Sequence, residues 1–342
     1  MKDLILDRRR LLKGVPAVAA TAMMPSLFGR SALAAELTEM TYLTPFGYLI
    51  SFVETMYADT GGFFEKNGLS VHIEGGRGSS MAVQQVTAQR ALVSRTGGTD
   101  LIKAYAADPS IVAIAEIVQK DLFYVISSKD APIEKPEDMV GKTIGIVSAA
   151  GATENLLDMM LAAGDIEKDG VAREAVGNAP AAFQLVQQGR IAAFIATSNT
   201  VFQLNVDKQP IHAWSTDEFA PCPGQVYMTS KAQLETSKET AAKFLSGVED
   251  CLGAMMGMDD LAPVVASMAE KYDIAESKRP DGGLSVLKES IKAYEKPYAD
   301  KLATDPAKWK SAYELMVKAK LIDPIDDLGF FDDSVRAIAF KG

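Results

Sequence analysis

The sequence contains few of the residues that form reactive or metal-binding centres. Its 342 residues include two histidines, His72 and His212, and two cysteines, Cys222 and Cys251. The histidines lie far apart along the chain, and no Cys/His cluster has the spacing of a metal site. Because no closely spaced cysteine framework exists, we expect two separate buried thiols. A Cys222–Cys251 disulfide is the alternative in an oxidising compartment.

Recognisable catalytic motifs are also missing. The sequence has no H-E-x-x-H zinc motif, no G-x-S-x-G nucleophile elbow and no P-loop. Three acidic pairs, Asp259-Asp260, Asp326-Asp327 and Asp332-Asp333, lie in polar turns at predicted helix starts. Carboxylates in such positions commonly cap helices. We therefore expect structural roles for these acids and no enzymatic activity.

Long hydrophobic runs are absent after the first 36 residues. The amino-terminal run from Gly14 to about Phe28 is about 15 residues long, shorter than the roughly 20 that span a bilayer. It follows the twin-arginine run Asp7–Lys13 and precedes the small-residue site Ala32-Leu33-Ala34. These features predict a twin-arginine signal peptide over residues 1–34, cleaved near Ala34, and a periplasmic mature protein. A transmembrane helix is the alternative.

Basic residues are outnumbered by acidic ones. The net charge is −10 at pH 7, and removal of the leader leaves 29 Lys/Arg against 43 Asp/Glu, a net charge of −14. Such a charge argues against nucleic acid or anionic lipid as a general partner. A local site can oppose the overall sign, so a small anionic ligand is not excluded.

The mature chain alternates short apolar runs with helical stretches, which predicts an α/β architecture with mostly parallel sheets. One such pattern covers residues 40–127 and a second covers 142–229. From Ser237 to about Tyr313 the pattern is helical, and Ser237 is predicted to cap a helix over 238–256. We expect two lobes, with the helical segment packed on the first. The predicted boundaries are 35–127 plus 230–342 for the first lobe and 128–229 for the second.

Small, polar and aromatic residues follow the predicted strands of both units. Open α/β sheets bind ligands beyond the carboxyl ends of their strands. Free N–H groups at glycine-rich helix starts suit a carboxylate, sulfonate or phosphate, whereas aromatic rings suit a planar or apolar ligand. The predicted ligand-binding residues are Phe46, Tyr48, Arg77, Gly78, Ser79, Ser80, Gly97, Gly98, Thr99, Ser148, Gly151, Ala152, Thr153, Ser198, Asn199, Trp214 and Tyr227.

Several of these residues have a structural alternative. Arg77 is a counter-ion for the ligand or is simply solvated. Either Trp214 or Tyr227 closes the far wall of the site, and a core position is an equal alternative for Trp214. The glycine-rich segment 75–80 is either a ligand loop or an ordinary tight turn.

Five segments carry a resemblance to a known family. They are Thr41–Phe46, the G-F-F-x-x-x-G-L-x-V string of Gly62–Val71, the loop and helix of Gly75–Gln85, the D-x-x-G-K-x-I-G string of Asp138–Gly145, and the tail from Trp309 to Ser334. In these segments the chain resembles the SsuA/THI5 (NMT1/THI5-like) group of periplasmic substrate-binding proteins. The resemblance covers nearly all of the mature chain.

The resemblance implies a type II-like periplasmic binding protein fold and a monomeric receptor without cofactors. Such a receptor closes on a small solute and hands it to an ABC permease and its ATPase. Family members serve sulfonates, nitrate, thiamine pyrimidine precursors and flavins, and the positions that choose the solute vary, so the solute stays open. One alternative is a THI5-type pyrimidine synthase, whose C-C-C-F-C iron motif is absent here. Another is the binding subunit of a membrane sensor.

Overall fold

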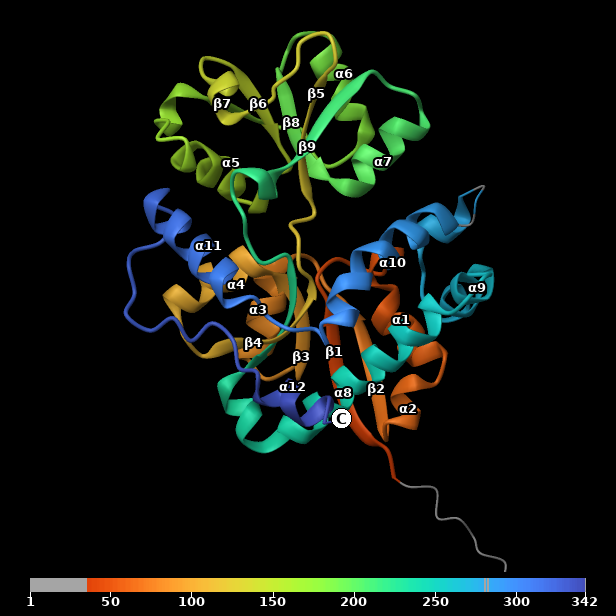
Figure 1. The fold of residues 1–342 in the computed structure, drawn as a ribbon. Helices are drawn as coiled ribbons and strands as arrows, with labels where there is room; N and C mark the ends of the chain where they lie inside the picture. Colours follow the sequence, from red (N-terminus) through yellow and green to blue (C-terminus); the bar gives the residue numbers. More distant parts are fainter. Residues whose placement is uncertain (1–35, 280, 282, 342) are drawn as a thin grey trace, which may run out of the picture. The chain divides into compact units, whose positions relative to one another are not determined.

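The strands form two five-stranded sheets in the computed structural model, which describes residues 36–341 except 280 and 282 (Figure 1). The predicted leader, 1–34, lies outside the described residues. The first sheet has the order β2-β1-β3-β10-β4, with strands β1 (Thr38–Thr44), β2 (Leu69–Gly75), β3 (Val93–Gly97), β4 (Ile111–Val118) and β10 (Gln225–Ser230). The second has the order β7-β6-β8-β5-β9, with strands β5 (Phe123–Ser128), β6 (Thr143–Ile146), β7 (Ala172–Ala175), β8 (Ala193–Thr197) and β9 (Ile211–Ser215).

One strand in each sheet runs against its neighbours. In the first sheet β10 pairs antiparallel with β3 and β4, whereas β1 pairs parallel with β2 and β3. In the second sheet β5 pairs antiparallel with β8 and β9, whereas β6 pairs parallel with β7 and β8. The prediction of mostly parallel sheets in two α/β lobes is therefore confirmed.

The chain crosses between the sheets earlier than the sequence predicted. β5 belongs to the second sheet and β10 to the first, so the crossings lie at residues 119–122 and 216–224. The predicted boundaries at 127/128 and 229/230 each fall one strand too late. β5 and β10 are both apolar runs. Such a run looks the same in sequence whichever of the two sheets the strand joins. We use first lobe and second lobe for the two sheets with the helices that contact them.

Short helices come after the strands in sequence and cover the faces of both sheets. In the first lobe these are α1 (Val53–Thr60), α2 (Phe63–Lys66), α3 (Ser79–Thr87) and α4 (Gly98–Ala107); in the second they are α5 (Ala152–Ala163), α6 (Phe183–Gln187) and α7 (Ser198–Val206). Short 3₁₀ helices are η1 (Ile50–Phe52), η2 (Pro136–Met139), η3 (Lys168–Gly170), η4 (Pro180–Ala182), η5 (Thr216–Glu218) and η6 (Ala275–Lys278). Figure 1 shows α3 and α4 on one side of the first sheet and α1 and α2 on the other.

The carboxy-terminal third of the chain, from Lys231 on, is helical, as predicted. It comprises α8 (Lys231–Met256), α9 (Ala262–Lys271), α10 (Leu284–Ala299), α11 (Pro306–Lys318) and α12 (Ser334–Ala339). Most of it contacts the first lobe: α8 packs on α1 and α2, and α10 packs on α8 and β4. α11 also contacts α5 of the second lobe, and Lys318 Nζ lies 2.7 Å from Asp165 Oδ1 there. The helical segment therefore reaches both lobes.

The start of α8 differs from the prediction. The helix begins at Lys231, and the Ser230 hydroxyl accepts a hydrogen bond from the backbone N–H of Gln233 at 3.2 Å. Ser237, the predicted cap, lies inside the helix at a kink with φ −129° and ψ 18°. Ser230 follows strand β10 directly, and serine is a preferred cap wherever the chain turns into a helix. Two serines thus fitted the capping pattern, and the first one starts the helix.

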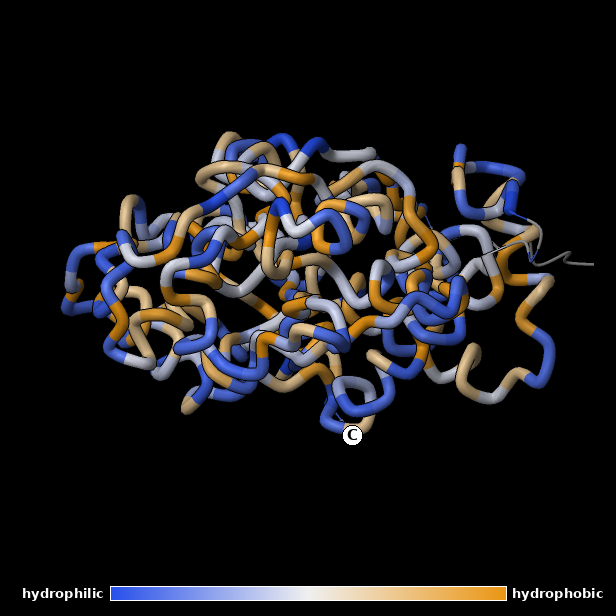
Figure 2. Tube along the Cα trace, turned by 90° about the horizontal axis from the view of Figure 1, so that it is seen from above, coloured by the Kyte–Doolittle hydropathy of each residue, from blue (hydrophilic) through white to orange (hydrophobic). Residues whose placement is uncertain are grey.

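Burial explains the strand patterns. β4 (Ile-Val-Ala-Ile-Ala-Glu-Ile-Val) is buried along its whole length, as expected for a strand covered on both faces. In the edge strand β2, Leu69, Val71 and Ile73 are buried and alternate with exposed residues. Figure 2 shows hydrophobic and hydrophilic residues alternating at short intervals along the trace.

Within 36–341, apart from 280 and 282, no helix has the length and apolar character needed to cross a membrane.

An ion pair lies inside the first lobe. Arg95 on β3 and Glu54 on α1 are 1% and 0% exposed, and Arg95 Nη1 lies 2.8 Å from Glu54 Oε1. The hydroxyls of Tyr227 and Tyr294 donate to the Glu54 carboxylate at 3.0 Å and 2.8 Å. The network joins β3, β10, α1 and α10. It satisfies both charges, which a buried pair requires.

We expect Glu54→Ala to destabilise the protein by about 3–5 kcal/mol, because it leaves the Arg95 guanidinium buried without a counter-charge. Urea denaturation at pH 7 measures this change. Glu314→Ala is the matched control: its partner Lys310 lies 3.8 Å away on the surface, and loss of an exposed pair costs at most about 1 kcal/mol. Equal losses from the two variants would contradict the stabilising role of the network.

Candidate functional site

Two linkers join the carboxyl edges of the two sheets. The first, 119–122, runs from the end of β4 to Phe123, which pairs with Thr197 at the carboxyl end of β8. The second, 216–224, leads to Gln225, which pairs with Gly97 at the carboxyl end of β3. Both crossings therefore connect the edges from which the predicted ligand loops emerge. Open α/β sheets bind ligands at this edge.

Each linker also accepts a hydrogen bond from the helix that starts beside it. The N–H of Gly98, at the start of α4, donates to the Gly224 carbonyl at 2.9 Å. The N–H of Ser198, at the start of α7, donates to the Leu122 carbonyl at 2.8 Å. A Cβ atom at Gly98 would lie 2.4 Å from the Pro223 Cβ. Gly98, a predicted ligand residue, thus lets α4 pack against the linker, and its N–H is already used.

Half-buried acids line the linkers. Asp121 accepts hydrogen bonds at one carboxylate oxygen from the Thr216 hydroxyl at 3.2 Å and from the Cys222 thiol at 3.4 Å. Lys308 on α11 donates to the Gln119 carbonyl at 2.6 Å and to Asp217 Oδ2 at 2.9 Å. These bonds connect the two linkers to each other and to the carboxy-terminal segment. Cys222 and Cys251 are separate buried thiols, as predicted.

The first-lobe loops 44–48 and 75–80 lie side by side. Phe46 and Arg77 form an isolated antiparallel bridge, and the N–H of Gly78 donates to the Pro45 carbonyl at 2.7 Å. A Cβ at Gly76 would lie 2.1 Å from the Thr44 carbonyl oxygen, so only glycine permits this approach. The Phe46 side chain is 54% exposed, and Arg77 is exposed as well. Ser80 is exposed too, and Gly78 and Ser79 are half-buried, so these residues with Phe46 and Arg77 form the accessible part of the first-lobe loops.

The starts of α3 and α4 meet through Asp100, which the sequence analysis did not select. Burial raises the pKa of the Asp100 carboxyl, and a hydrogen bond from the Ser79 side chain partly opposes this rise. A Cβ at Gly97 would lie 3.3 Å from Asp100 Oδ2. Asp100 therefore ties two predicted ligand loops together. Its place two residues after the Gly97-Gly98 pair, at a helix start, was the available signal.

In the second lobe, part of the loop 148–154 is occupied by its own bonds. Thr153 is buried, and its hydroxyl accepts from the N–H of Val147 at 2.9 Å. Glu154 accepts from the N–H of Ala150 at 2.5 Å. Ser148 remains exposed, and Gly151 and Ala152 are half-buried. Of the predicted ligand residues in this loop, Ser148, Gly151 and Ala152 are thus accessible, and Thr153 has a structural role.

The second-lobe loop 197–200 is held by Asn178, which the sequence analysis also missed. Asn178 Oδ1 accepts from the N–H of Thr197 at 2.9 Å, and the Thr200 hydroxyl donates to the Asn178 carbonyl at 2.7 Å. Ser198 is exposed and Asn199 is half-buried. Asn178 lies before α6, far from this loop in sequence, so no local pattern indicated the contact.

Four helix starts at these edges share one property. The residues before α3, α4, α5 and α7 provide no side-chain capping hydrogen bond. The same holds for α1, α2, α6, α9, α10 and α12, whereas side chains cap α8 and α11, so the missing cap is not particular to these edges. Uncapped first turns can present N–H groups and the positive end of the helix dipole to an anion, although the N–H groups of Gly98 and Ser198 at the starts of α4 and α7 already donate to the linkers.

Three predicted aromatic residues do not lie at an open site. Trp214 is 6% exposed, and its indole N–H donates to the Ile133 carbonyl at 2.6 Å. Tyr227 is fully buried in the Glu54–Arg95 network. The half-buried Tyr48 packs against Tyr272, with ring centroids 5.0 Å apart. The prediction that Trp214 or Tyr227 closes the site is wrong, because both are core residues with satisfied donors. Thr99 is buried as well.

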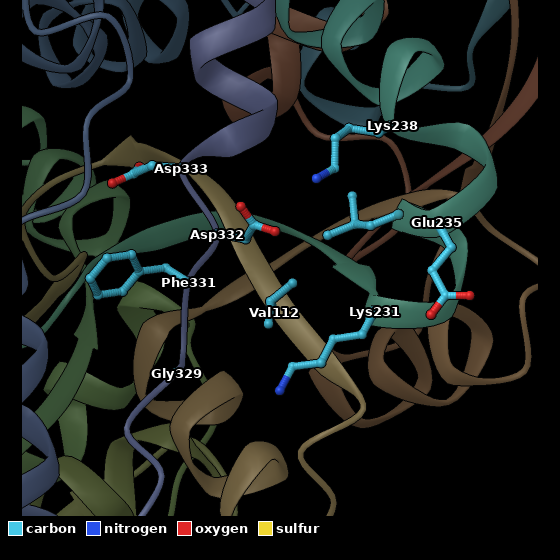
Figure 3. A pocket seen from close by; sticks show the side chains of 9 residues that line it. Val112, Lys231, Glu235, Lys238, Gly329, Phe331, Asp332 and Asp333 are labelled. Carbon is cyan, nitrogen blue, oxygen red and sulfur yellow. The ribbon is translucent and has the colours of Figure 1, made fainter.

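A cavity of about 490 Å³ lies away from the ligand loops, between the start of α8, β4 and the segment 329–333 (Figure 3). Two of its charged groups have partners within the fold: Lys231 donates to the Tyr105 hydroxyl at 3.2 Å, and Asp333 pairs with Arg336 at 2.8 Å. Asp332 accepts from the N–H of Ser334 at 2.8 Å, in agreement with the predicted structural role of the acidic pairs. This cavity contains no predicted site residue. Among the residues that the structure describes, no cluster of His, Cys, Asp and Glu could hold a metal ion.

Several solved structures with this fold are described as periplasmic binding proteins or as having their fold. The alkanesulfonate-binding protein SsuA from Xanthomonas axonopodis pv. citri, bound to MOPS, is 12% identical, with a TM-score of 0.61 over 85% of this chain and 96% of that chain. The periplasmic aliphatic sulphonate binding protein SsuA from Escherichia coli is 13% identical, with a TM-score of 0.59 over 88% and 91%. A Candida albicans protein with the generic periplasmic binding protein fold is 12% identical, with a TM-score of 0.61 over 89% and 95%. At these identities the likeness establishes the fold.

The sequence itself matches one family model. The model described as NMT1/THI5 like covers residues 50–260, which include strands of both sheets and both linkers. No curated protein matches the chain. The family match therefore rests on the part of the chain that forms the two carboxyl edges.

Glu116, a buried acid of β4 close to the linkers, makes stability depend on pH. Burial raises the pKa of Glu116, at the end of β4, to about 7, and the N–H groups of Asp305 and Gly224 oppose this rise only in part. Because the pKa is raised on folding, the unfolded chain loses this proton first, and stability falls as the pH rises from about 4.5 to about 7. We expect Glu116→Gln to stabilise the protein by on the order of 2–3 kcal/mol at pH 8 and by little at pH 4.5.

Urea denaturation of both proteins across this pH range measures the difference. The exposed Glu314→Gln is the matched control, and its difference from the wild type should stay small at every pH. A Glu116→Gln difference that does not grow between pH 4.5 and pH 7 would contradict the burial of an ionisable Glu116.

Proposed function

Because this chain belongs to the NMT1/THI5-like family, we propose that it is a periplasmic receptor that closes on a small organic solute and delivers it to an ABC permease. The observation that carries the proposal is the meeting of two carboxyl edges at two short linkers. Each edge offers uncapped helix starts, and the linkers hold α4 and α7 beside the crossing. A solute between the edges would contact both lobes.

We propose a small organic anion, such as a sulfonate or carboxylate, as the solute. Uncapped helix starts favour an anionic group, and Arg77 adds an exposed cation to the first-lobe loops. The exposed Phe46 ring offers a surface for the apolar or aromatic body of the solute. The residues proposed to contact it are Phe46, Arg77, Gly78, Ser79, Ser80 and Gly97 from the first lobe, and Ser148, Gly151, Ala152, Ser198 and Asn199 from the second. Two structural neighbours are sulfonate-binding proteins by name, which makes sulfonates the first class to test.

The mature protein, residues 35–342, should gain thermal stability with one solute class from a panel of alkane- and arylsulfonates, carboxylates, pyrimidines and flavins. At a solute concentration 100 times Kd the gain is about 2.7 kcal/mol. Arg77→Gln should weaken binding about tenfold, because it removes a charge-assisted contact. Calorimetric titration measures the change.

Arg90→Gln is the matched control, because Arg90 is exposed in the same lobe just after α3 and outside the loops. Equal effects of Arg77→Gln and Arg90→Gln on solute affinity would contradict a contact between Arg77 and the solute. No thermal shift with any member of the panel would count against the receptor function itself.

We propose that binding leaves the solute chemically unchanged. Pyrimidine synthases of the THI5 type carry a C-C-C-F-C iron motif, and this sequence lacks it. Long incubation of the solute with the protein and added ferrous iron tests the point. Recovery of unaltered solute supports the receptor, and turnover would favour a pyrimidine-synthase activity.

We propose that residues 1–34 direct twin-arginine export and that the mature protein acts as a monomer in the periplasm. Changing Arg8 and Arg9 together to lysine should retain the uncleaved precursor in the cytoplasm, because the export receptor reads the arginine pair. Cell fractionation and immunoblotting measure the distribution. Arg30→Lys, a change of the same kind outside the twin-arginine run, should export normally. Export of the double variant at the wild-type level would contradict this route.

A further inference from the structure

The two linkers lie in direct contact with each other. A Cβ atom at Gly224 would lie 2.3 Å from the carbonyl oxygens of Val118 and Lys120. Thr216 and Cys222, from the second linker, both donate to Asp121 on the first. Figure 1 shows the linkers as the yellow and green segments between the two sheets. Hinge motions are absorbed at a few such connecting residues, so a movement of one lobe relative to the other would change the contacts of Asp121.

Asp121 is half-buried and has no cation beside it. Lys308 reaches both linkers, but it pairs with Asp217 at 2.9 Å. Asp217 also accepts from the N–H of Cys222 at 3.3 Å, so a second carboxylate shares this junction. In the described part of the chain, Asp121 forms no ion pair. An ionised Asp121 is therefore costly in this arrangement of the linkers.

The hydrogen bonds around Asp121 suit the neutral carboxyl group. The Thr216 oxygen lies 3.2 Å from Asp121 Oδ2 and 3.1 Å from the Phe123 carbonyl oxygen. A hydroxyl has one proton to donate and can also accept. When Asp121 is neutral, its O–H can donate to Thr216, and Thr216 can donate to the Phe123 carbonyl. When Asp121 is ionised, Thr216 must choose between the two acceptors.

The other ionisable groups at the junction leave two acids that change charge between pH 4 and pH 7. The groups are Cys222, Asp217 and Glu218 near the second linker, Glu116 and Lys120 near the first, Tyr124 on β5, and Asp305 and Lys308 at the start of α11. Burial raises the pKa values of the Cys222 thiol and the Tyr124 hydroxyl, so both stay neutral. Burial also raises the pKa of Asp121 to about 6, although hydrogen bonds from Cys222 and Thr216 oppose the rise. Glu116 is the other acid that titrates in this range.

We propose that Asp121 makes the junction of the two lobes respond to protons. The neutral carboxyl holds the linkers as they lie in this structure, and its ionisation favours a second arrangement of the lobes in which water reaches the carboxylate. An unpaired carboxylate gains free energy from hydration, and water can reach it only if the linkers separate at Thr216 and Cys222. A solute that binds one arrangement better than the other would then have a pH-dependent affinity, even if the solute itself does not titrate.

Single-molecule energy transfer between dyes on the two lobes tests the proposal without any solute. The mature protein carries Thr87→Cys and Asn205→Cys, at exposed positions of α3 and α7, while Cys222 and Cys251 are buried and stay unlabelled. The pKa of Asp121 is raised in the present arrangement and returns toward its ordinary value in the hydrated one. Protonation therefore favours the present arrangement as the pH falls from about 6 to about 4.

The population ratio of the present to the second arrangement should rise on the order of tenfold between pH 7 and pH 4.5. Asp121→Asn is neutral at every pH and should show the low-pH distribution throughout. Glu116→Gln is the matched control, because it removes the other acid that titrates here, and it should keep the wild-type response. A wild-type distribution that is the same at both pH values would overturn the proposal. So would a response that survives Asp121→Asn and disappears in Glu116→Gln.

Asp217→Asn provides a second test if Asp121→Asn fails to fold. It removes the neighbouring negative charge, so the midpoint of the response should move to lower pH. An unchanged midpoint would contradict the role of Asp121. Because no solute is present, these outcomes do not depend on the proposed receptor function, which the solute panel tests separately.

Discussion

The two linkers at 119–122 and 216–224 are the constraint on which the rest of the structure depends. They leave and enter the sheets at carboxyl edges, so every loop that follows a parallel strand starts near the crossing. They also accept the first N–H groups of α4 and α7. Each helix after a central strand is therefore positioned by the same segment that joins the lobes. A change in the linker geometry would move both helix starts together.

Two buried polar networks serve different purposes in this frame. Glu54 and Arg95 sit within the first lobe and connect β3 to α1, α10 and β10, which favours one fixed packing of that lobe. Asp121, Thr216 and Cys222 lie at the linkers, and Lys308 joins them to α11. The first network is closed and fully paired. The second network connects the two linkers and α11, and any movement of one lobe relative to the other would have to change the geometry of the linkers.

The sequence was informative wherever a local pattern decides the structure. The alternation of apolar runs and helices predicted both α/β units, and glycine-rich strand exits predicted the loops at 75–80 and 148–154. Membership of β5 and β10 in a sheet could not be read in this way, because a strand's pattern does not say which neighbours it pairs with. Trp214 and Tyr227 looked like site residues because they lie near strand ends, yet their partners, Ile133 and Glu54, are distant in sequence. Asn178 was missed for the same reason, whereas Asp100 had a local signal in its place at a helix start after Gly97-Gly98.

The place of β10 in the first sheet has a consequence for the order in which the chain folds. β10 lies between β3 and β4, although more than a hundred residues separate it from either strand in the sequence. The first sheet therefore stays incomplete during synthesis until residues 225–230 have emerged. The second sheet is built from one continuous segment and has no such delay. Because non-local pairing is slow to form, the second lobe should fold first. Until β10 has been synthesised, the edges of β3 and β4 that pair with it stay unpaired. Unpaired strand edges are prone to aggregate, so the nascent first lobe should bind a chaperone.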